Sequence, residues 1–325
     1  MAPVRPVVIV TRRLPAAVEE ALRASFEVRL NHSDRQYTAA ELRAALAEAD
    51  ALLCTLTDPL NASVLGEGSL RARLLANFGA GTDHIDLEAA RRAGLAVTNT
   101  PGVLTDCTAD LAIALMLMVS RRLGEGERQL RRGDWPGWHP THLLGHRLSG
   151  RTVGVVGFGR IGQAVARRAH HGFGMRVLAH ARRPIPAGTL SGSQAIGVAD
   201  LDALLAQADI VSLHLPLSAE TRHLFDAARL ARMQRHAILI NTARGEVVDE
   251  AALAAALHGG ALAGAGLDVF EEEPRVHPAL LTAPNTVLLP HLGSATEETR
   301  TAMGLRAVEN LRAFFRGDAP PDRVA

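Results

Sequence analysis

The sequence predicts an α/β protein with two doubly wound parallel-sheet domains. Two observations carry this prediction. Short apolar runs alternate with helical patterns along the chain, which is typical of parallel sheets covered by helices on both faces. The length of 325 residues suits two domains that each bury their own core, and 47% hydrophobic with 21% charged residues is ordinary for a globular protein.

The first set of apolar runs ends before residue 100. Its expected strands are residues 7–10, 28–30, 51–56, 74–78 and 96–98, with helical patterns at residues 39–49 and 87–93. Pro101-Gly102 interrupts this alternation and marks a domain boundary. Thr105 can cap the next helix, which we expect to run to about Arg122.

The second set of strands begins at Thr152. The expected strands are residues 153–156, 177–179, 210–215, 237–241, 264–269 and 287–289. Six strands with intervening helices match a dinucleotide-binding domain. A final helix over residues 297–315 is expected to return to the first domain. We therefore expect a discontinuous domain of residues 1–100 plus 295–325, and a dinucleotide-binding domain of residues 101–294.

The glycine turn of the second set is the motif on which the rest of the chain depends. It reads Gly157-Phe158-Gly159-Arg160-Ile161-Gly162 and lies between a strand and a helix. Gly157 permits the tight turn, Gly159 lets the backbone approach a pyrophosphate, and Gly162 lets the helix pack near the strand. The N–H groups and the dipole of the helix N-terminus favour the anion. These six residues are therefore predicted to bind a dinucleotide.

The end of the second strand indicates which dinucleotide. A site for NAD usually has an acidic residue there, about 20 residues after the glycine turn. Ala181, Arg182 and Arg183 stand at this place, and no acidic residue occurs from Trp135 to Ala199. Arginine can form charge-assisted hydrogen bonds with a 2′-phosphate. NADP(H) is therefore predicted over NAD(H), although both arginines could instead face solvent and NAD(H) stays open.

The composition excludes several kinds of chemistry and partner. The chain has no lysine, which rules out Schiff-base catalysis and a lysine-bearing P-loop. A net charge of +1 attracts neither nucleic acid nor membranes, so no such partner is expected. Cys54 and Cys107 lack metal-ligand spacing and are too few for a disulfide framework. We expect two buried thiols, no metal site and a cytoplasmic protein.

The segment 131–149 reads as an irregular loop that holds both tryptophans of the chain, Trp135 and Trp138. Only 3% of the residues are aromatic, so two tryptophans in one loop indicate a contact surface. A plain surface loop is the alternative. We expect an arm at residues 123–150 that joins two copies of the chain in a homodimer.

Polar residues follow several strands at the edge where parallel sheets bind ligands. The small residues of the loop 79–83 leave backbone N–H groups accessible to an anion. In the second set, residues 241–245, 268–274 and 290–295 follow the last three strands. All three segments are expected beside the nicotinamide end of a bound dinucleotide.

The sequence resembles the D-isomer-specific 2-hydroxyacid dehydrogenases, most of all their glyoxylate/hydroxypyruvate reductase branch. The resembling stretches are residues 10–15, 79–87, 157–162, 241–245, 266–270 and 290–294. They cover nearly the full chain in the order of the family. The resemblance implies a Rossmann NAD(P)-binding domain and a smaller flavodoxin-like substrate domain.

The resemblance also implies residue roles. Arg244 would hold the substrate carboxylate and polarise the carbonyl, His291 would act as the general acid, and Glu273 would orient His291 and favour its charged form. Asp268 would bond the nicotinamide amide, and the N–H groups of Ala80 and Gly81 would bind the carboxylate. The further residues implied to line the cofactor are Thr108, Pro216, Thr221, Thr242, Ala243 and Gly293, together with Arg244 and His291.

These roles agree with the chemistry. A 2-oxo acid carries an anion beside its electrophilic carbon, so a fixed guanidinium both binds and orients it. Reduction builds negative charge on oxygen, which a nearby imidazolium neutralises by proton transfer. The expected activity is NADPH-preferring reduction of glyoxylate and hydroxypyruvate to D-2-hydroxy acids. An NAD(H)-using enzyme for another 2-oxo acid, or a binding protein of the corepressor type with this fold, remain the alternatives.

Overall fold

The computed structural model describes residues 5–66 and 70–325, and contacts divide the chain into two compact units. Unit 1 is Met1–Leu104 with Ala295–Ala325, and unit 2 is Thr105–Ser294. Each unit is an α/β fold built on a parallel sheet, which confirms the predicted fold class.

The sheet of unit 1 has the strand order β2-β1-β3-β4-β5, and all its pairings are parallel. Its strands are β1 (Val7–Val10), β2 (Glu27–Leu30), β3 (Ala51–Thr55), β4 (Leu74–Phe78) and β5 (Ala96–Thr98). This is the strand order of flavodoxin-like folds, in which ligands bind where the winding reverses, between β1 and β3.

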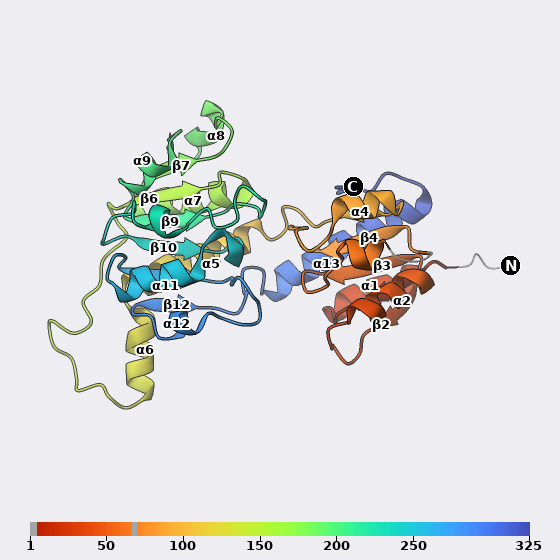
Figure 1. Ribbon diagram of the computed structural model, residues 1–325, viewed down its shortest axis with the longest axis horizontal. Coiled ribbons are helices and arrows are strands. Elements are labelled where there is room, and N and C mark those ends of the chain that lie inside the picture. Colours follow the sequence, from red (N-terminus) through yellow and green to blue (C-terminus); the bar gives the residue numbers. More distant parts are fainter. Residues whose placement is uncertain (1–4, 67–69) are drawn as a thin grey trace. The chain divides into compact units, whose positions relative to one another are not determined.

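Helices cover both faces of this sheet (Figure 1). They are α1 (Ala16–Ser25), α2 (Ala39–Glu48), α3 (Ala62–Leu65), α4 (Leu87–Arg92) and α13 (Glu297–Arg316). α1 and α13 bury residues such as Leu22 and Leu311 on one face, and α2, α3 and α4 pack on the other. Helix α13 therefore belongs to unit 1, although it is the last helix of the chain.

The sheet of unit 2 has seven parallel strands in the order β12-β11-β10-β9-β6-β7-β8. They are β6 (Thr152–Val156), β7 (Arg176–His180), β8 (Ile196–Gly197), β9 (Ile210–Leu213), β10 (Ile238–Asn241), β11 (Gly264–Leu267) and β12 (Thr286–Leu288). This is the Rossmann order with one strand added at the β12 edge, and its winding reverses between β6 and β9.

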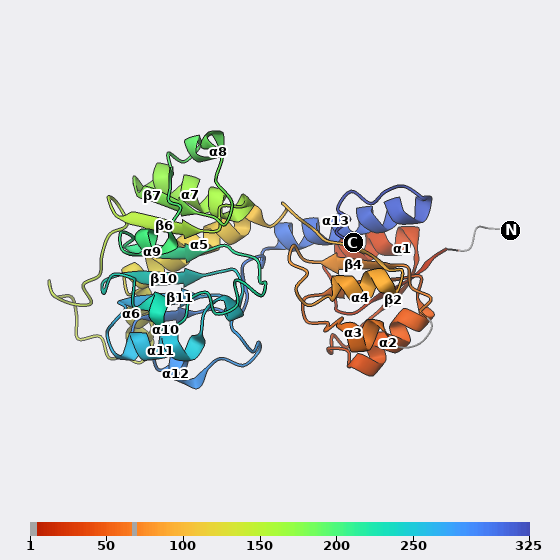
Figure 2. The same cartoon turned by 45° about the horizontal axis from the view of Figure 1, so that its top comes forward.

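Successive side chains of each strand in unit 2 point to opposite faces of the sheet, so each face has its own hydrophobic layer. Val153 and Val155 of β6 face α5 (Thr105–Ser120) and α7 (Arg160–Phe173). Val156 faces the opposite layer, to which four further helices contribute leucines. The remaining helices of unit 2, shown in Figure 2, are α6 (Leu123–Arg131), α8 (Ala187–Ser191), α9 (Leu201–Leu205), α10 (Ala227–Leu230), α11 (Glu250–His258) and α12 (Pro278–Leu281).

Three local predictions differ from the structure. The two-residue strand β8 was not predicted, because both of its residues are exposed and too few to form an apolar run. Thr105 is the first residue of α5 rather than a cap before it. Cys54 is buried as expected, and burial raises the pKa of its thiol, whereas Cys107 is only half-buried.

No helix in the described part of the chain is long and apolar enough to cross a membrane. Within the same residues, no group of three or more His, Cys, Asp and Glu side chains could hold a metal ion.

Candidate active site

The glycine turn of unit 2 connects β6 to α7 at the point where the winding of the sheet reverses. Gly157 has a φ of +94°, and a Cβ atom there would lie 2.4 Å from the carbonyl oxygen of His214. A Cβ atom on Gly162 would lie 2.1 Å from the carbonyl oxygen of Gly157. Only glycine therefore fits at these two positions. Phe158 is buried, Ile161 is half-buried, and Arg160 is exposed at the first turn of α7.

Three observations fit a dinucleotide at this turn. A Cβ atom on Gly159 would meet no other atom within 4 Å, so the turn is open on that side. The first N–H groups of a helix such as α7 have no partner within the helix and favour an anion. The buried Oγ1 of Thr242 and Nδ1 of His214 have no hydrogen-bond partner among the described residues. Buried polar atoms of this kind are suited to a polar ligand.

The loop that follows β9 holds two of the residues predicted to line the cofactor. The hydroxyl of Thr221 donates a hydrogen bond to the carbonyl of Pro216 at 2.7 Å and accepts one from the N–H of Ser218 at 2.8 Å. The Thr221 hydroxyl therefore fixes the shape of its own loop. Because β9 is the neighbour of β6 in the sheet, this loop stands beside the glycine turn.

Arg182 and Arg183 follow β7, and both are exposed. A guanidinium nitrogen of Arg182 lies 3.8 Å from a carboxylate oxygen of Glu220, with both side chains more than two-thirds exposed. An ion pair this exposed contributes little stability. Both arginines are therefore accessible to an anionic group, as the predicted role requires.

Arg244 follows β10, and two neighbours hold its backbone. The side-chain amide of Asn241 donates to the carbonyl oxygen of Arg244 at 2.8 Å, and Asn241 Oδ1 accepts from the N–H of Ala243 at 3.0 Å. Gly245 packs so closely on Phe270 that a Cβ atom would overlap its backbone. Arg244 Nη1 also donates to the carbonyl of Ala243 at 2.7 Å, while Ala243 and Thr242 are buried.

Asp268 follows β11 and organises the loop after β12. One of its carboxylate oxygens accepts the N–H of Leu292 at 2.6 Å, and the other accepts the N–H of Gly293 at 2.8 Å. Its carbonyl oxygen accepts the N–H of His291 at 2.9 Å. Burial raises the pKa of the Asp268 carboxyl, although these N–H groups and His291 oppose the change. The hydrogen bond to a nicotinamide amide stays a prediction.

Thr108 completes the support of this loop from helix α5. Its buried hydroxyl donates to the carbonyl oxygen of Gly293 at 3.0 Å. The loop that carries His291 is thus held from two sides, by Asp268 and by Thr108. His291 itself adopts a left-handed backbone conformation with a φ of +53°, which is uncommon for a residue with a side chain.

Glu273 and His291 are in direct contact. Nδ1 of His291 lies 2.9 and 3.2 Å from the two carboxylate oxygens of Glu273, and about 30% of each side chain is exposed. Burial raises the pKa of the Glu273 carboxyl, but the hydrogen bond and charge of His291 and the charge of Arg244 outweigh it, so the net shift is downward. A carboxylate bound to Nδ1 leaves Nε2 as the nitrogen that can transfer a proton.

The structure also separates Glu273 from the two glutamates that precede it. Glu271 accepts the N–H of Glu250 at 2.8 Å and contacts His223 at 2.9 Å, and Glu272 pairs with Arg275. Among the three glutamates, only Glu273 contacts His291. The residue pattern alone could not make this choice, because all three are consecutive.

In unit 1, the predicted residues Ala80 and Gly81 lie in the loop after β4. Asn77 and Asn99, which were not among the predicted site residues, donate hydrogen bonds to this loop. Asparagine at the ends of two neighbouring strands, beside a loop of small residues, is the signal that could have identified them.

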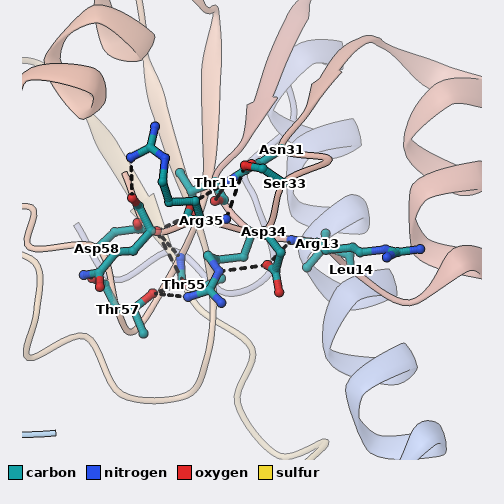
Figure 3. Close-up of polar contacts among 12 residues, drawn as sticks. Thr11, Arg13, Leu14, Asn31, Ser33, Asp34, Arg35, Thr55, Thr57 and Asp58 are labelled. Carbon is teal, nitrogen blue, oxygen red and sulfur yellow. Dashed lines mark hydrogen bonds and ion pairs between the residues drawn. The ribbon is translucent and has the colours of Figure 1, made fainter. Parts of the chain in front are cut away.

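A second polar cluster of unit 1 lies after β1, β2 and β3 (Figure 3). Asp58 is fully buried and accepts hydrogen bonds from the Thr11 hydroxyl at 2.5 Å and the Thr55 N–H at 2.8 Å. Arg12 pairs with Asp34 at 2.9 Å. These contacts join the three loops where the winding of the sheet reverses.

The chain is similar to known proteins over nearly its whole length. Residues 113–293 match the family model described as the D-isomer specific 2-hydroxyacid dehydrogenase, NAD binding domain. A glyoxylate reductase of Thermococcus litoralis is 44% identical over 98% of this chain and 97% of that enzyme. A glyoxylate reductase of Korarchaeum cryptofilum is 45% identical over 98% of this chain and 96% of its own length.

Among solved structures, the chain is similar to an NADPH-dependent glyoxylate/hydroxypyruvate reductase of Sinorhizobium meliloti, in complex with NADP and malonate. The TM-score is 0.87 at 37% sequence identity, and the match covers 99% of this chain and 97% of the other.

Proposed function

Because the chain belongs to the D-isomer-specific 2-hydroxyacid dehydrogenase family and is an NAD(P)-dependent dehydrogenase, we propose that it reduces small 2-oxo acids to D-2-hydroxy acids. Glyoxylate and hydroxypyruvate are the proposed substrates, as the names of its relatives suggest. The family resemblance predicted from the sequence is confirmed. The observation that carries the proposed reaction is the contact between Glu273 and His291 Nδ1.

His291 is the proposed general acid. When bound, the reduced nicotinamide dinucleotide supplies the hydride, which becomes the new C–H bond at the carbonyl carbon of the substrate. The carbonyl oxygen gains negative charge as its double bond opens. Protonated His291 then transfers its Nε2 proton to that oxygen, which becomes the product hydroxyl. Glu273 keeps Nδ1 facing away from the substrate and stabilises the positive charge of the imidazolium before the transfer.

Arg244 and the loop of Ala80 and Gly81 are the proposed carboxylate ligands. The positive charge of Arg244 contributes to the lowered pKa of the Glu273 carboxyl. This supports a position of the Arg244 guanidinium near Glu273 and His291. A guanidinium can bind a carboxylate with two parallel hydrogen bonds, which orients the adjacent carbonyl. The N–H groups of Ala80 and Gly81 are proposed as further donors to a carboxylate.

NADPH is the proposed cofactor. Support comes from Arg182 and Arg183, which are exposed after β7 at a position that lacks the acidic residue expected for NAD. The Glu220 carboxylate near Arg182 is exposed, so a 2′-phosphate could take its place beside the guanidinium. The related reductase of Sinorhizobium meliloti is also described as NADPH-dependent.

The arm at residues 123–150 is the proposed dimer contact. Of the ten exposed large hydrophobic side chains in the described residues, five lie here. They are Leu123, Leu130, Trp135, Trp138 and Leu144, and helix α6 has no buried residue. Exposed apolar side chains this concentrated are typical of interaction surfaces. Replacing both tryptophans by glutamate is expected to halve the mass that light scattering measures in solution.

The cytoplasm stays the proposed location, because neither cysteine forms a disulfide.

The first experiment is an initial-rate assay of NADPH and NADH oxidation, with glyoxylate and hydroxypyruvate as acceptors. Fast turnover that favours NADPH is the expected result. Turnover that favours NADH would retain the reaction and contradict the cofactor assignment. Tight cofactor binding without turnover of any 2-oxo acid would contradict the proposed reaction and favour a binding protein.

A further inference from the structure

The loop at residues 79–81 of unit 1 has all three of its carbonyl oxygens bound by side-chain amides. Asn77 Nδ2 donates to the carbonyl of Gly79 at 3.2 Å and to that of Gly81 at 2.8 Å. Asn99 Nδ2 donates to the carbonyl of Ala80 at 2.7 Å. Asn77 belongs to β4 and Asn99 follows the neighbouring strand β5, so the loop is held from two strand ends.

These hydrogen bonds determine where the N–H groups of the loop point. In a trans peptide the carbonyl and the next N–H point to opposite sides. The carbonyl of Gly79, bound by Asn77 and also by the N–H of Thr100 at 2.9 Å, therefore orients the N–H of Ala80. The bond to the carbonyl of Ala80 orients the N–H of Gly81. Both N–H groups face away from the asparagines, and neither donates to a backbone carbonyl of the described residues outside regular elements.

The burial of Asn77 indicates that its side-chain amide has the role of binding this loop. The side chain is fully buried between strands, where an apolar residue would be expected. Its two amide hydrogens are both used by loop carbonyls, and its Oδ1 has no partner in the described part of the chain. A Cβ atom on Gly79 would lie 3.4 Å from Asn77 Nδ2, so the loop backbone lies directly on the amide.

We infer that Asn77 and Asn99 are positioning residues that orient the N–H groups of Ala80 and Gly81 toward the carboxylate of the substrate. The inference rests on the proposed function, because that function assigns a carboxylate to this loop. Two N–H donors fixed in one direction bind an anion without first losing conformational freedom. The asparagines therefore act on recognition of the carboxylate and leave hydride and proton transfer to other residues.

The test replaces each asparagine by leucine, which has a similar size and no donor. Asn77→Leu and Asn99→Leu are compared with wild type on glyoxylate and on methylglyoxal, which has the reactive carbonyl but no carboxylate. Each variant is expected to raise the KM for glyoxylate about tenfold, roughly the effect of one lost hydrogen bond to a charged group. Its kcat/KM for methylglyoxal is expected to match wild type. Asn99 is only half-buried, so its variant should fold even if the variant of Asn77 does not.

A matched control is Asn61→Leu, because Asn61 also uses its side chain on backbone groups of unit 1, at the start of α3. This control should leave both substrates unaffected. A loss that is equal for glyoxylate and methylglyoxal would indicate general damage to the fold and overturn the inference. An unchanged KM for glyoxylate in both asparagine variants would overturn it as well.

Calorimetric titration of the NADPH-bound protein with oxalate separates this inference from the proposed function. If the wild type is active but oxalate affinity does not fall in the variants, the positioning role is wrong and the reaction stands. If the wild type reduces no 2-oxo acid but its oxalate affinity falls about tenfold in the variants, the reaction is wrong and the anion site stands. A wild type that neither reacts nor binds oxalate would overturn both.

Discussion

Glu273 accepts a hydrogen bond from Nδ1 of His291, with the nearer carboxylate oxygen 2.9 Å away. The two residues are 18 positions apart and come from loops after different strands. Phe270 donates its N–H to Glu273 at 3.1 Å, and Asp268 accepts the N–H of His291 at 2.9 Å. The backbone around the pair thus fixes both partners, which is the kind of support that a general acid needs.

Removal of the imidazole is expected to stop the chemical step. His291→Asn should lower kcat by roughly 10²–10⁴-fold, the usual contribution of general acid catalysis. The affinity for NADPH, measured by fluorescence titration, should change little. His236→Asn is the control, because His236 pairs with Asp209 before β9, at the opposite end of the sheet. Near-normal turnover of His291→Asn would exclude the acid role.

Removal of the carboxylate is expected to move the pH profile. The bond to His291 lowers the pKa of Glu273, and the Glu273 carboxylate places a negative charge 2.9 Å from Nδ1 of the imidazole. Glu273→Gln keeps the size of the side chain and removes this negative charge. The alkaline limb of kcat/KM for reduction should therefore shift to lower pH, by about one unit for each 1.4 kcal/mol. A profile that does not move would show that the pair does not control protonation.

Arg182 and Arg183 are expected to act on the 2′-phosphate alone. The double variant Arg182→Ala with Arg183→Ala should weaken NADPH binding at least tenfold and leave NADH nearly unchanged, since only NADPH carries the extra phosphate. Arg176→Ala is the control, because Arg176 is exposed at the opposite end of the same strand, β7. Equal losses for the two cofactors would place the arginines outside the phosphate site.

Two glycines of helix α7 provide a matched pair of alanine substitutions. In Gly162→Ala the new Cβ atom would lie 2.1 Å from the carbonyl oxygen of Gly157, so the turn must move and NADPH affinity should fall by at least an order of magnitude. In Gly172→Ala the Cβ atom would meet nothing within 4 Å. That variant should gain about 0.5–1 kcal/mol of unfolding free energy and keep its affinity. Similar affinities in both variants would contradict the role of the turn.

His214 is expected to make unit 2 sensitive to acid. Burial lowers the pKa of its imidazole from 6.5 to about 3. The unfolded chain therefore binds the proton more readily, and the stabilising contribution is present in full above pH 6.5 and is lost as the pH falls toward 3. Between pH 7 and pH 5 the wild type should lose about 2 kcal/mol more unfolding free energy than His214→Gln, as measured by urea denaturation. Parallel losses would show that His214 is already accessible to protons.

Some parts of the site could be predicted because their signals are local. The glycine turn at residues 157–162 depends on the contacts of a strand, a turn and a helix that follow each other in the chain. Strands such as β4 and β10 are visible as apolar runs, because a parallel sheet buries both faces. The edge strand β8 lacked this signal, since Ile196 and Gly197 are exposed.

Other parts depend on which residues meet in space. The family resemblance, rather than the spacing of residues, distinguished Glu273 from Glu271 and Glu272, and only the structure shows the different partners of the three. Asp268 and Thr221 are predicted to line the cofactor, and their hydrogen bonds also hold the backbone of nearby loops. Hydrogen bonds between loops cannot be read from a single stretch of sequence.

The sequence by itself determined the two parallel sheets, the glycine turn and the absence of lysine chemistry, because hydrophobic period, glycine spacing and composition are properties of the chain. Its resemblance to known sequences identified the family. The tertiary structure decided that His291 turns Nδ1 toward Glu273, and that Asn77 and Asn99 bind the carbonyl oxygens of the loop at residues 79–81. The reason is physical. A hydrogen bond requires a donor and an acceptor about 3 Å apart, and only the packing of the strands brings residues distant in sequence to that separation.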